Sequence, residues 1–341
     1  MRAKFKQHRL EFKRPSGTSR GVLTTKDSWF LILKEKDKIG VGECSVLEGL
    51  SLDDPKRIES LLHDLCNALE SGATLPDLSA WPAVQMGLEL ALLSLQSKKT
   101  FSIFPSDFSR GEKKIPINGL VWMGDFEFMN VQIKHLLDSG FNCIKLKIGA
   151  IDFQAELKLL SQVRERYNEN EITIRVDANG AFKPDEALEK LKRLSDYHVH
   201  SIEQPIGAGQ LESMVDLCQR SPVPIALDEE LIGSFNMAEK QRLIDQINPQ
   251  FIILKPSLLG GFSKAEEWIK IATNASIGWW VTSALESNVG LNAIAQWTYQ
   301  LGVSMPQGLG TGSLFVNNIT SPLFIESGCL GIDNSIPWDI I

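Results

Sequence analysis

The stretch FNCIKLKIG, residues Phe141–Gly149, is the segment from which the fold of the chain can first be deduced. It is short, apolar and contains β-branched residues, which predicts a strand. A run this apolar is typical of a strand buried on both faces, as in a parallel sheet covered by helices. Lys145 and Lys147 are two residues apart, so both side chains project from the same face. Burying two ammonium groups is costly, so we expect either partner carboxylates or a site that uses the charges.

Strands and helices alternate through the whole second part of the chain. Eight strands are predicted, and each except the last is followed by a helical pattern; they lie at 115–122, 141–148, 172–179, 198–205, 223–230, 251–257, 277–286 and near 308–312. Such alternation predicts an α/β fold with a parallel sheet, and eight units that close on themselves make a barrel. An open, doubly wound sheet usually has fewer strands and a glycine-rich phosphate turn after its first strand, which this chain lacks.

The first part of the chain has a different pattern of predicted strands and helices. Residues 1–45 are rich in predicted strands, and two helices are predicted over 53–71 and 81–95 from their apolar spacing. Residues 98–113 are polar and irregular and contain proline and glycine, so we place a domain boundary there.

Composition narrows the class of protein. The 341 residues carry a net charge of −7, which argues against a nucleic-acid partner. No stretch is apolar and long enough to be a signal peptide or to cross a bilayer, so no membrane partner is expected. Five cysteines lack CxxC spacing, which favours reduced thiols in a cytoplasmic protein. We expect a small-molecule ligand and a monomer or homo-oligomer.

Ionisable residues end five successive strands of the predicted barrel. They are Lys147, Asp177, Glu203, Asp228 and Lys255, separated by 30, 26, 25 and 27 residues, or one strand–helix unit each. The C-terminal strand ends of a barrel form one ring, and active sites lie there. Three carboxylates should therefore converge, with a lysine on either side.

Three neighbouring carboxylates would repel one another strongly in a site of low dielectric. An oxygen-preferring divalent cation relieves the repulsion, and Mg²⁺, with Mn²⁺ as a substitute, suits a carboxylate set that leaves room for water and substrate. No histidine or cysteine joins the group, which argues against zinc or copper. The alternative is a purely structural ion network.

The two flanking lysines allow two interpretations. Each could simply neutralise a neighbouring carboxylate. Alternatively, the pKa of a lysine close to a metal ion and a second ammonium is lowered, so that it can act as a base near neutral pH. Lys147 and Lys255 lie on opposite flanks of the predicted metal, an arrangement suited to removing a proton next to a carboxylate while the cation holds the enediolate charge.

Taken together, these motifs resemble the enolase superfamily, and within it the muconate-lactonizing-enzyme-like subgroup. The matching motifs are the KxK of 145–147, VDAN (176–179), IEQP (202–205), LDEE (227–230) and LKPS (254–257). The resemblance implies an N-terminal α+β capping domain over 1–113, to which segment 313–341 returns, and a (β/α)7β barrel over 114–312. It implies Asp177, Glu203 and Asp228 as Mg²⁺ ligands, and Lys147 and Lys255 as the acid/base pair.

Within that subgroup the chain is most similar to the o-succinylbenzoate synthase family of menaquinone biosynthesis. The similarity is carried by GTSRGVL (17–23) with DSWFL (27–31), VGECSVLEGLS (41–51), INGLVWMG (117–124), TSALESNVGLNAIAQ (282–296) and MPQGLGTG (305–312). It implies a Mg²⁺-dependent syn dehydration of 2-succinyl-6-hydroxy-2,4-cyclohexadiene-1-carboxylate through an enediolate. Lys147 would take the α-proton and then protonate the departing hydroxyl, and Lys255 would stabilise the enediolate.

Further substrate contacts are expected, each with a plainer alternative. Lys145 is predicted to pair with the substrate carboxylate, and Asn179 either contacts the substrate or a metal-bound water or forms a turn. Gly310 is predicted to let backbone approach the ligand. Two further groups complete the set. Ser19 and Arg20 form either a hairpin connection or a flap that meets an anion. Ser283, Ser287 and Asn288 either cap a helix or bind the succinyl carboxylate at its N-terminus.

Two other functions stay open. An N-succinylamino acid racemase or dipeptide epimerase of the same subgroup would use the same lysines on opposite faces of the substrate. GLGTG (308–312) counts against a dipeptide epimerase, which carries an acidic DxD there. A non-catalytic barrel that retains the metal is the alternative from another class.

Overall fold

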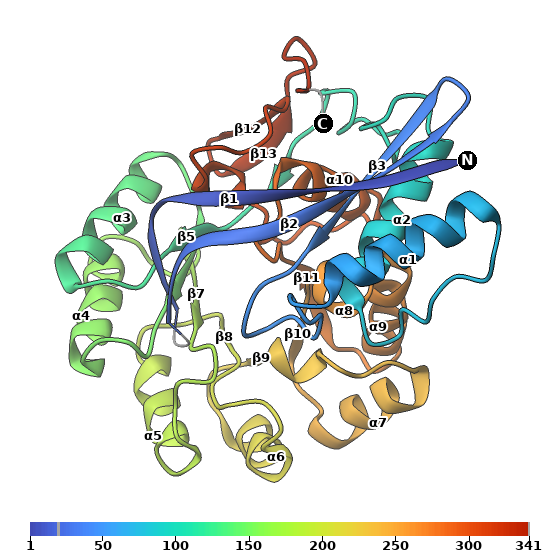
Figure 1. The fold of residues 1–341 in the computed structure, drawn as a ribbon. Coiled ribbons are helices and arrows are strands. Elements are labelled where there is room, and N and C mark those ends of the chain that lie inside the picture. Colours follow the sequence, from blue (N-terminus) through green and yellow to red (C-terminus); the bar gives the residue numbers. More distant parts are fainter. Residues whose placement is uncertain (19–20, 340–341) are drawn as a thin grey trace.

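The computed structural model describes residues 1–18 and 21–339, which form an N-terminal sheet with two helices and a parallel barrel (Figure 1). The N-terminal sheet is antiparallel, in the order β1-β2-β3. Its elements are β1 (Arg2–Thr18), β2 (Gly21–Glu35), β3 (Lys38–Ser45), α1 (Ile58–Ser71) and α2 (Pro82–Gln96).

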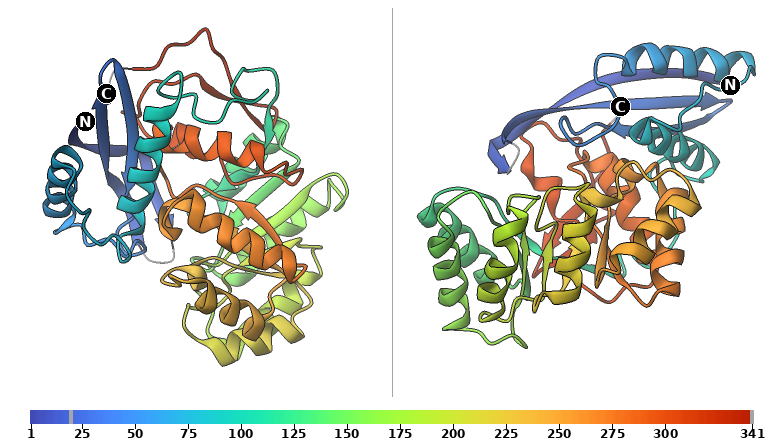
Figure 2. Two further views of the ribbon diagram at one scale, coloured as in Figure 1. Left: turned by 90° about the vertical axis from the view of Figure 1, so that its right-hand side faces the viewer. Right: turned by 90° about the horizontal axis from the view of Figure 1, so that it is seen from below.

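Both faces of this sheet are apolar, which explains the unbroken run of buried residues in β2. Trp29, Leu31 and Leu33 alternate along the strand and pack with the buried faces of α1 and α2. The intervening Phe30 and Ile32 pack on the opposite face against Val289 of the barrel. The sheet therefore lies between α1 and the barrel, whereas α2 packs on both the sheet and the barrel, as the two views of Figure 2 show.

The barrel strands are parallel and follow the chain in the order β5 to β11. They are β5 (Gly119–Val121), β6 (Cys143–Lys147), β7 (Thr173–Asp177), β8 (Ser201–Glu203), β9 (Ile225–Leu227), β10 (Phe251–Leu254) and β11 (Gly278–Val281). The helices are α3 (Phe126–Asp138), α4 (Phe153–Arg164), α5 (Pro184–Ser195), α6 (Leu211–Arg220), α7 (Met237–Ile247), α8 (Pro256–Leu259), α9 (Phe262–Asn274) and α10 (Asn288–Gln300), with short 3₁₀ turns at Glu229–Leu231 and Thr311–Leu314.

A very short eighth segment closes the barrel. The backbone N–H of Asn118 donates to Gln307 O at 2.9 Å, and that of Gly308 donates to Val281 O at 2.8 Å. Gln307 and Gly308 therefore bridge β11 to the segment before β5. The final short strand, expected to end near 308–312, consists of the bridges at Gln307 and Gly308, and residues 311–314 form a 3₁₀ helix.

The C-terminal residues return across both parts of the molecule. β12 (Leu323–Glu326) and β13 (Cys329–Ile332) form a hairpin that pairs with β4 (Ile115–Pro116). The N–H of Val316 donates to Glu11 O in β1 at 2.9 Å, and Trp338 stacks on Phe101 with ring centroids 4.2 Å apart. None of the helices within the described ranges is apolar and long enough to span a membrane.

Candidate active site

Charged side chains converge at the C-terminal ends of the barrel strands. Lys147 is the register partner of Asp177, and Asp177 is the partner of Glu203, so the three residues stand at one level of the sheet. Asp177 and Glu203 are each 1% exposed. Because partners in a parallel sheet point the same way, these groups face the interior of the barrel together.

Two lysines of β6 hold the first two carboxylates. The Nζ of Lys145 lies 3.1 Å from Asp177 Oδ2 and 2.7 Å from Glu203 Oε2. The Nζ of Lys147 lies 3.0 Å from Asp177 Oδ2 and donates to Asn179 Oδ1 at 2.6 Å. Burial alone would raise the pKa of Asp177, but Lys147 and Lys145 outweigh it and hold that pKa well below its usual value. Asp177 is therefore a stable anion.

The opposite side of the group is built around Lys255. Its Nζ lies 3.3 Å from Glu203 Oε1 and also contacts Asp228 Oδ2. Burial lowers the pKa of Lys255, but Asp228 and Glu203 outweigh burial and raise it. Burial raises the pKa of Asp228 well above its usual value, and Glu229 and Glu203 add to this rise while Lys255 opposes it. Negative charge is therefore in excess around Asp228.

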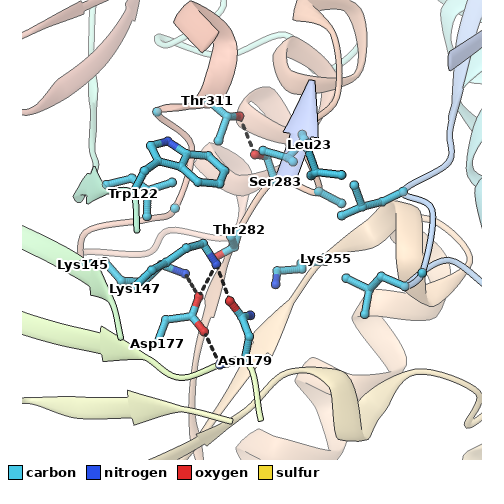
Figure 3. Close-up of a pocket in the computed structure, with 18 of the residues that line it drawn as sticks. Leu23, Trp122, Lys145, Lys147, Asp177, Asn179, Lys255, Thr282, Ser283 and Thr311 are labelled. Atoms are coloured by element: carbon cyan, nitrogen blue, oxygen red, sulfur yellow. Dashed lines mark hydrogen bonds and ion pairs between the residues drawn. The ribbon is translucent and has the colours of Figure 1, made fainter. Parts of the chain in front are cut away.

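A cavity of about 320 Å³ opens above these groups, within the range of small-molecule sites (Figure 3). One wall carries Lys145, Lys147, Asp177, Asn179 and Lys255. The remaining walls come from the N-terminal domain and from the first, seventh and eighth barrel segments: Gly21, Val22, Leu23, Leu47, Glu48, Gly49, Leu50, Asn118, Leu120, Trp122, Thr282, Ser283, Ala284, Leu285, Gly308, Gly310 and Thr311.

Comparisons with known proteins agree with this geometry. A family model described as "Enolase C-terminal domain-like" matches residues 129–332. An o-succinylbenzoate synthase of Desulfotalea psychrophila is 47% identical, and the match covers 97% of this chain and 99% of that protein. The chain belongs to the enolase superfamily. A crystal structure of MenC from D. psychrophila has a TM-score of 0.87 and 44% identity over 97% of this chain and 99% of that one. A D-Ala-D/L-Ala epimerase of Cytophaga hutchinsonii is 25% identical, over 84% of this chain and 80% of that protein.

The predicted fold, a barrel with an N-terminal capping domain, is confirmed by these enolase-superfamily relatives. Members of the superfamily bind a divalent metal ion. In the part of the chain that the structure describes, no three carboxylate, imidazole or thiol groups lie close enough together to hold one ion. Ammonium groups connect these carboxylates instead: Lys145 bridges Asp177 to Glu203, and Lys255 bridges Glu203 to Asp228.

The donor set nevertheless fits a metal of this kind. All three groups are carboxylates, the ligands that hard divalent cations prefer. The excess of negative charge around Asp228 is what a bound cation would relieve.

Four of the predicted substrate-binding residues line the cavity, namely Lys145, Asn179, Ser283 and Gly310. Asn179 shows the turn expected for it, with a φ of 43° in the left-handed region, and its amide bonds both Lys147 and Glu229; its contact with the substrate stays a prediction. The hydroxyls of Ser283 and Thr311 are 2.5 Å apart, so one of the two hydrogens is available to a ligand.

The N-terminus of α10 differs from the expectation that it binds substrate. Glu43 of β3 accepts hydrogen bonds from Ser287 N at 2.8 Å, Ser287 Oγ at 2.5 Å and Gly290 N at 2.9 Å. The anion at this helix terminus is therefore supplied by the capping domain. Ser287 is fully buried, and Asn288 donates to Ile319 O, so neither lines the cavity. Ser287 follows the capping alternative, since its Oγ accepts from Val289 N at 3.2 Å, whereas the side chain of Asn288 does not cap the helix.

Ser19 and Arg20 lie outside the described residues. The strands on either side form a hairpin in which Thr18 pairs with Gly21 and Gly17 with Val22. Gly21, Val22 and Leu23 line the cavity, so the hairpin reaches the site.

Three cavity residues on the first and seventh barrel segments were missed by the sequence analysis: Asn118, Trp122 and Thr282. Asn118 Oδ1 and Thr282 Oγ1 are buried and have no hydrogen-bond partner within residues 1–18 and 21–339. Trp122 lies over Lys147, with the Nζ 5.8 Å from a ring centroid. Strand alternation could have identified Asn118 and Trp122. Each lies two residues from Leu120, which is the register partner of Lys145, so all three side chains are on the face that carries Lys145.

Proposed function

We propose that the chain is an o-succinylbenzoate synthase, a carbon–oxygen hydro-lyase of menaquinone biosynthesis. The reaction converts 2-succinyl-6-hydroxy-2,4-cyclohexadiene-1-carboxylate to o-succinylbenzoate and water. The observation that carries the proposal is one cavity in which Lys147 and Lys255 flank buried carboxylates, in a chain 47% identical to a relative of that name over nearly its whole length.

Lys147 is the proposed acid and base. Its neutral amine takes the proton from the ring carbon next to the carboxylate, and the electron pair of the broken C–H bond delocalises into the carboxylate as an enediolate. The enediolate electrons then form a new C=C bond in the ring while the ring C–O bond breaks. The Lys147 ammonium gives its proton to the departing hydroxyl on the same face. Water leaves and the ring becomes aromatic. Asn179, 2.6 Å from Lys147 Nζ, fixes the direction of the amine.

Lys255 and Lys145 contribute charge rather than proton transfer in this proposal. Lys255 faces the cavity and remains an ammonium, because Asp228 and Glu203 raise its pKa. It can therefore stabilise the negative charge of the enediolate. Lys145 also lines the cavity, and its ammonium would meet the substrate carboxylate while it holds Asp177 and Glu203 in place.

Asp177, Glu203 and Asp228 are the residues that would hold Mg²⁺, with Mn²⁺ as a substitute. Two dipeptide epimerases of the same fold, from Enterococcus faecalis and C. hutchinsonii, were crystallised as magnesium complexes. When bound, the cation would supply positive charge opposite the carboxylate on which negative charge develops. The substrate is a small carboxylate, and the five free cysteines support a site of action in the cytoplasm.

An N-succinylamino acid racemase is the second candidate, because Lys147 and Lys255 both line the cavity and approach it from different strands. A racemase needs one base on each face of the substrate, so it would depend on both lysines equally. A dehydration on one face needs only Lys147 as a base.

The deciding experiment is an assay of the magnesium-loaded protein that follows loss of absorbance of the cyclohexadiene substrate. Lys147→Ala is expected to lower kcat by about 10³-fold, within the range of general acid–base catalysis. Persistent turnover in Lys147→Ala would remove this residue from its role. If the wild type exchanges the α-hydrogen of N-succinylamino acids in D₂O but leaves the cyclohexadiene intact, the racemase is the correct function. A magnesium-loaded protein that does neither is a non-catalytic barrel.

A further inference from the structure

A buried charged network lies directly behind the cavity wall, and the proposed chemistry does not use it. Its ionisable members are Lys26, Glu43 and Glu286, which are at most 4% exposed. Lys26 and Glu43 belong to the capping sheet, whereas Glu286 precedes α10 of the barrel. Burying three charges has a cost, so their arrangement needs an explanation beyond packing.

Glu286 connects two walls of the cavity. Its Oε1 accepts from Ser257 Oγ at 2.6 Å, and its Oε2 accepts from Ala284 N at 2.7 Å. Ala284 lines the cavity beside Ser283. Ser257 lies two residues beyond Lys255, on α8, a helix of only four residues that starts immediately after Lys255. A helix of one turn has little rigidity of its own, so its direction depends on such contacts.

Glu43 links the start of α10, next to Glu286, to the capping domain. It accepts from Ser28 Oγ at 2.7 Å within its own sheet and from three donors at the start of α10. Glycine at position 290 leaves room for both side chains, because a Cβ there would lie 2.9 Å from Glu43 Oε2 and 2.8 Å from Glu286 Cβ. After Glu43 the chain runs on to Leu47 and Leu50, which line the cavity.

Lys26 balances this pair of carboxylates without touching either. Its Nζ donates to Ser28 Oγ at 3.0 Å and to Ser45 Oγ at 2.7 Å. Burial lowers the pKa of Lys26, while Glu43 and Glu286 oppose this, which places all three charges in one electrostatic group. The group therefore joins both domains at the back of the site.

We propose that Ser257 and Glu286 are positioning residues for Lys255, and that Glu43 couples the docking of the capping domain to that position. The inference rests on the proposed function, in which Lys255 stabilises the developing charge. Its physical basis is that a misplacement of about 1 Å in a group that acts on the transition state costs up to about 10²-fold in rate. Loss of the Ser257 hydroxyl frees the turn that carries Lys255 without removing any group from the cavity.

The test compares Ser257→Ala with Gln296→Ala. Gln296 is an equally buried side chain on α10, and it bonds the backbone of Phe101, Ile103 and Phe104 away from the cavity. We expect Ser257→Ala to lower kcat about 10-fold with KM changed less than about threefold, and Ser257→Thr, which keeps the hydroxyl, to recover most of the loss. Gln296→Ala should lower Tm but leave kcat unchanged.

A second readout does not depend on the substrate. Reductive methylation followed by peptide mass spectrometry measures how fast Lys255 is modified, with exposed Lys192 as the internal reference. Ser257→Ala should raise the relative rate at Lys255 several-fold, and Gln296→Ala should not. If the wild type fails to turn over the cyclohexadiene, the proposed function falls while this measurement still decides the positioning role.

The inference is overturned if Ser257→Ala keeps both wild-type kcat and the wild-type rate of Lys255 modification, or if Gln296→Ala reproduces its losses. Should Ser257→Ala fail to fold, Glu43→Gln carries the same test with an expected kcat loss of about threefold. Unchanged kcat and Lys255 modification in a folded Glu43→Gln would then overturn the coupling of the capping domain.

Discussion

The barrel side of the cavity has two halves that are built from different strands, and the N-terminal domain adds a further wall (Figure 3). The half on β6, β7 and β10 carries three lysines and Asp177, with Glu203 and Asp228 behind them. The half on β5, β11 and residues 308–311 carries hydroxyls, one amide and an indole. We call these the ionic half and the neutral half.

The two halves are suited to different tasks: the ionic half to the chemical step and the neutral half to substrate recognition. In the ionic half each charge is fixed by a partner of opposite sign, which gives a preorganised field where the reaction develops charge. In the neutral half, Asn118 Oδ1 and Thr282 Oγ1 have no partner among the described residues, although both are buried. Since buried polar groups are rarely left unpaired, a ligand or water completes them. The neutral half should therefore select the substrate, and the following predictions test that division.

Glu203→Gln should give the largest effect, because it removes the carboxylate that Lys145 and Lys255 share. Activity is expected to fall by about 10²–10³-fold, as when a preorganised electrostatic group is lost. The metal-free variant should also lose about 3 kcal/mol of unfolding free energy, because two buried ammonium groups lose a partner. The cyclohexadiene assay and denaturant unfolding check these two expectations, and titration calorimetry measures the affinity for Mg²⁺. Unchanged magnesium affinity would exclude Glu203 as a ligand.

Thr282→Val tests the neutral half and should act on KM rather than kcat. Loss of one ligand hydrogen bond is expected to raise KM about 10-fold and to change kcat by less than about threefold. Thr298→Val is a matched control, since Thr298 Oγ1 is also buried and has no partner in the described chain, yet it does not line the cavity. Equal effects of the two substitutions, or a fall in kcat alone, would break the proposed division.

Glu156→Gln should give the smallest effect, and only on the pH dependence of stability. Glu156 accepts from Gly149 N at 2.6 Å in the loop after Lys147, and burial raises its pKa from 4.5 to about 7. The folded state therefore keeps a proton that the unfolded chain releases, so stability falls as pH rises. Between pH 6 and pH 8 the loss is about 1 kcal/mol. The slope of unfolding free energy against pH should flatten in Glu156→Gln; an identical slope contradicts the assignment.

The ionic half could be predicted from the sequence because its signal repeats. Lys147, Asp177 and Glu203 each end a strand, and Asp228 and Lys255 each follow one directly. A strand end in a parallel barrel has a fixed place. A buried charge also demands a partner, so one such residue predicts the next. The structure brings these five residues together, and their role as metal ligands and bases stays a prediction that the Glu203 and Lys147 variants test.

The neutral half gave no comparable signal. Asn118 and Thr282 are residue types that occur throughout the chain, and what directs them to the cavity is the two-residue bridge at Gln307 and Gly308. The start of α10 misled the prediction for a related reason. Its sequence is that of an anion-binding helix terminus, but the anion is Glu43, 244 residues away in the chain.

The sequence by itself determined the barrel and its ring of charges, because strand–helix periodicity is local and buried charges must be matched. The tertiary structure alone decided which uncharged side chains face the substrate and which carboxylate meets α10. Those outcomes depend on contacts between segments that are remote in the chain, and a hydroxyl, an amide or a helix terminus can be satisfied by many partners.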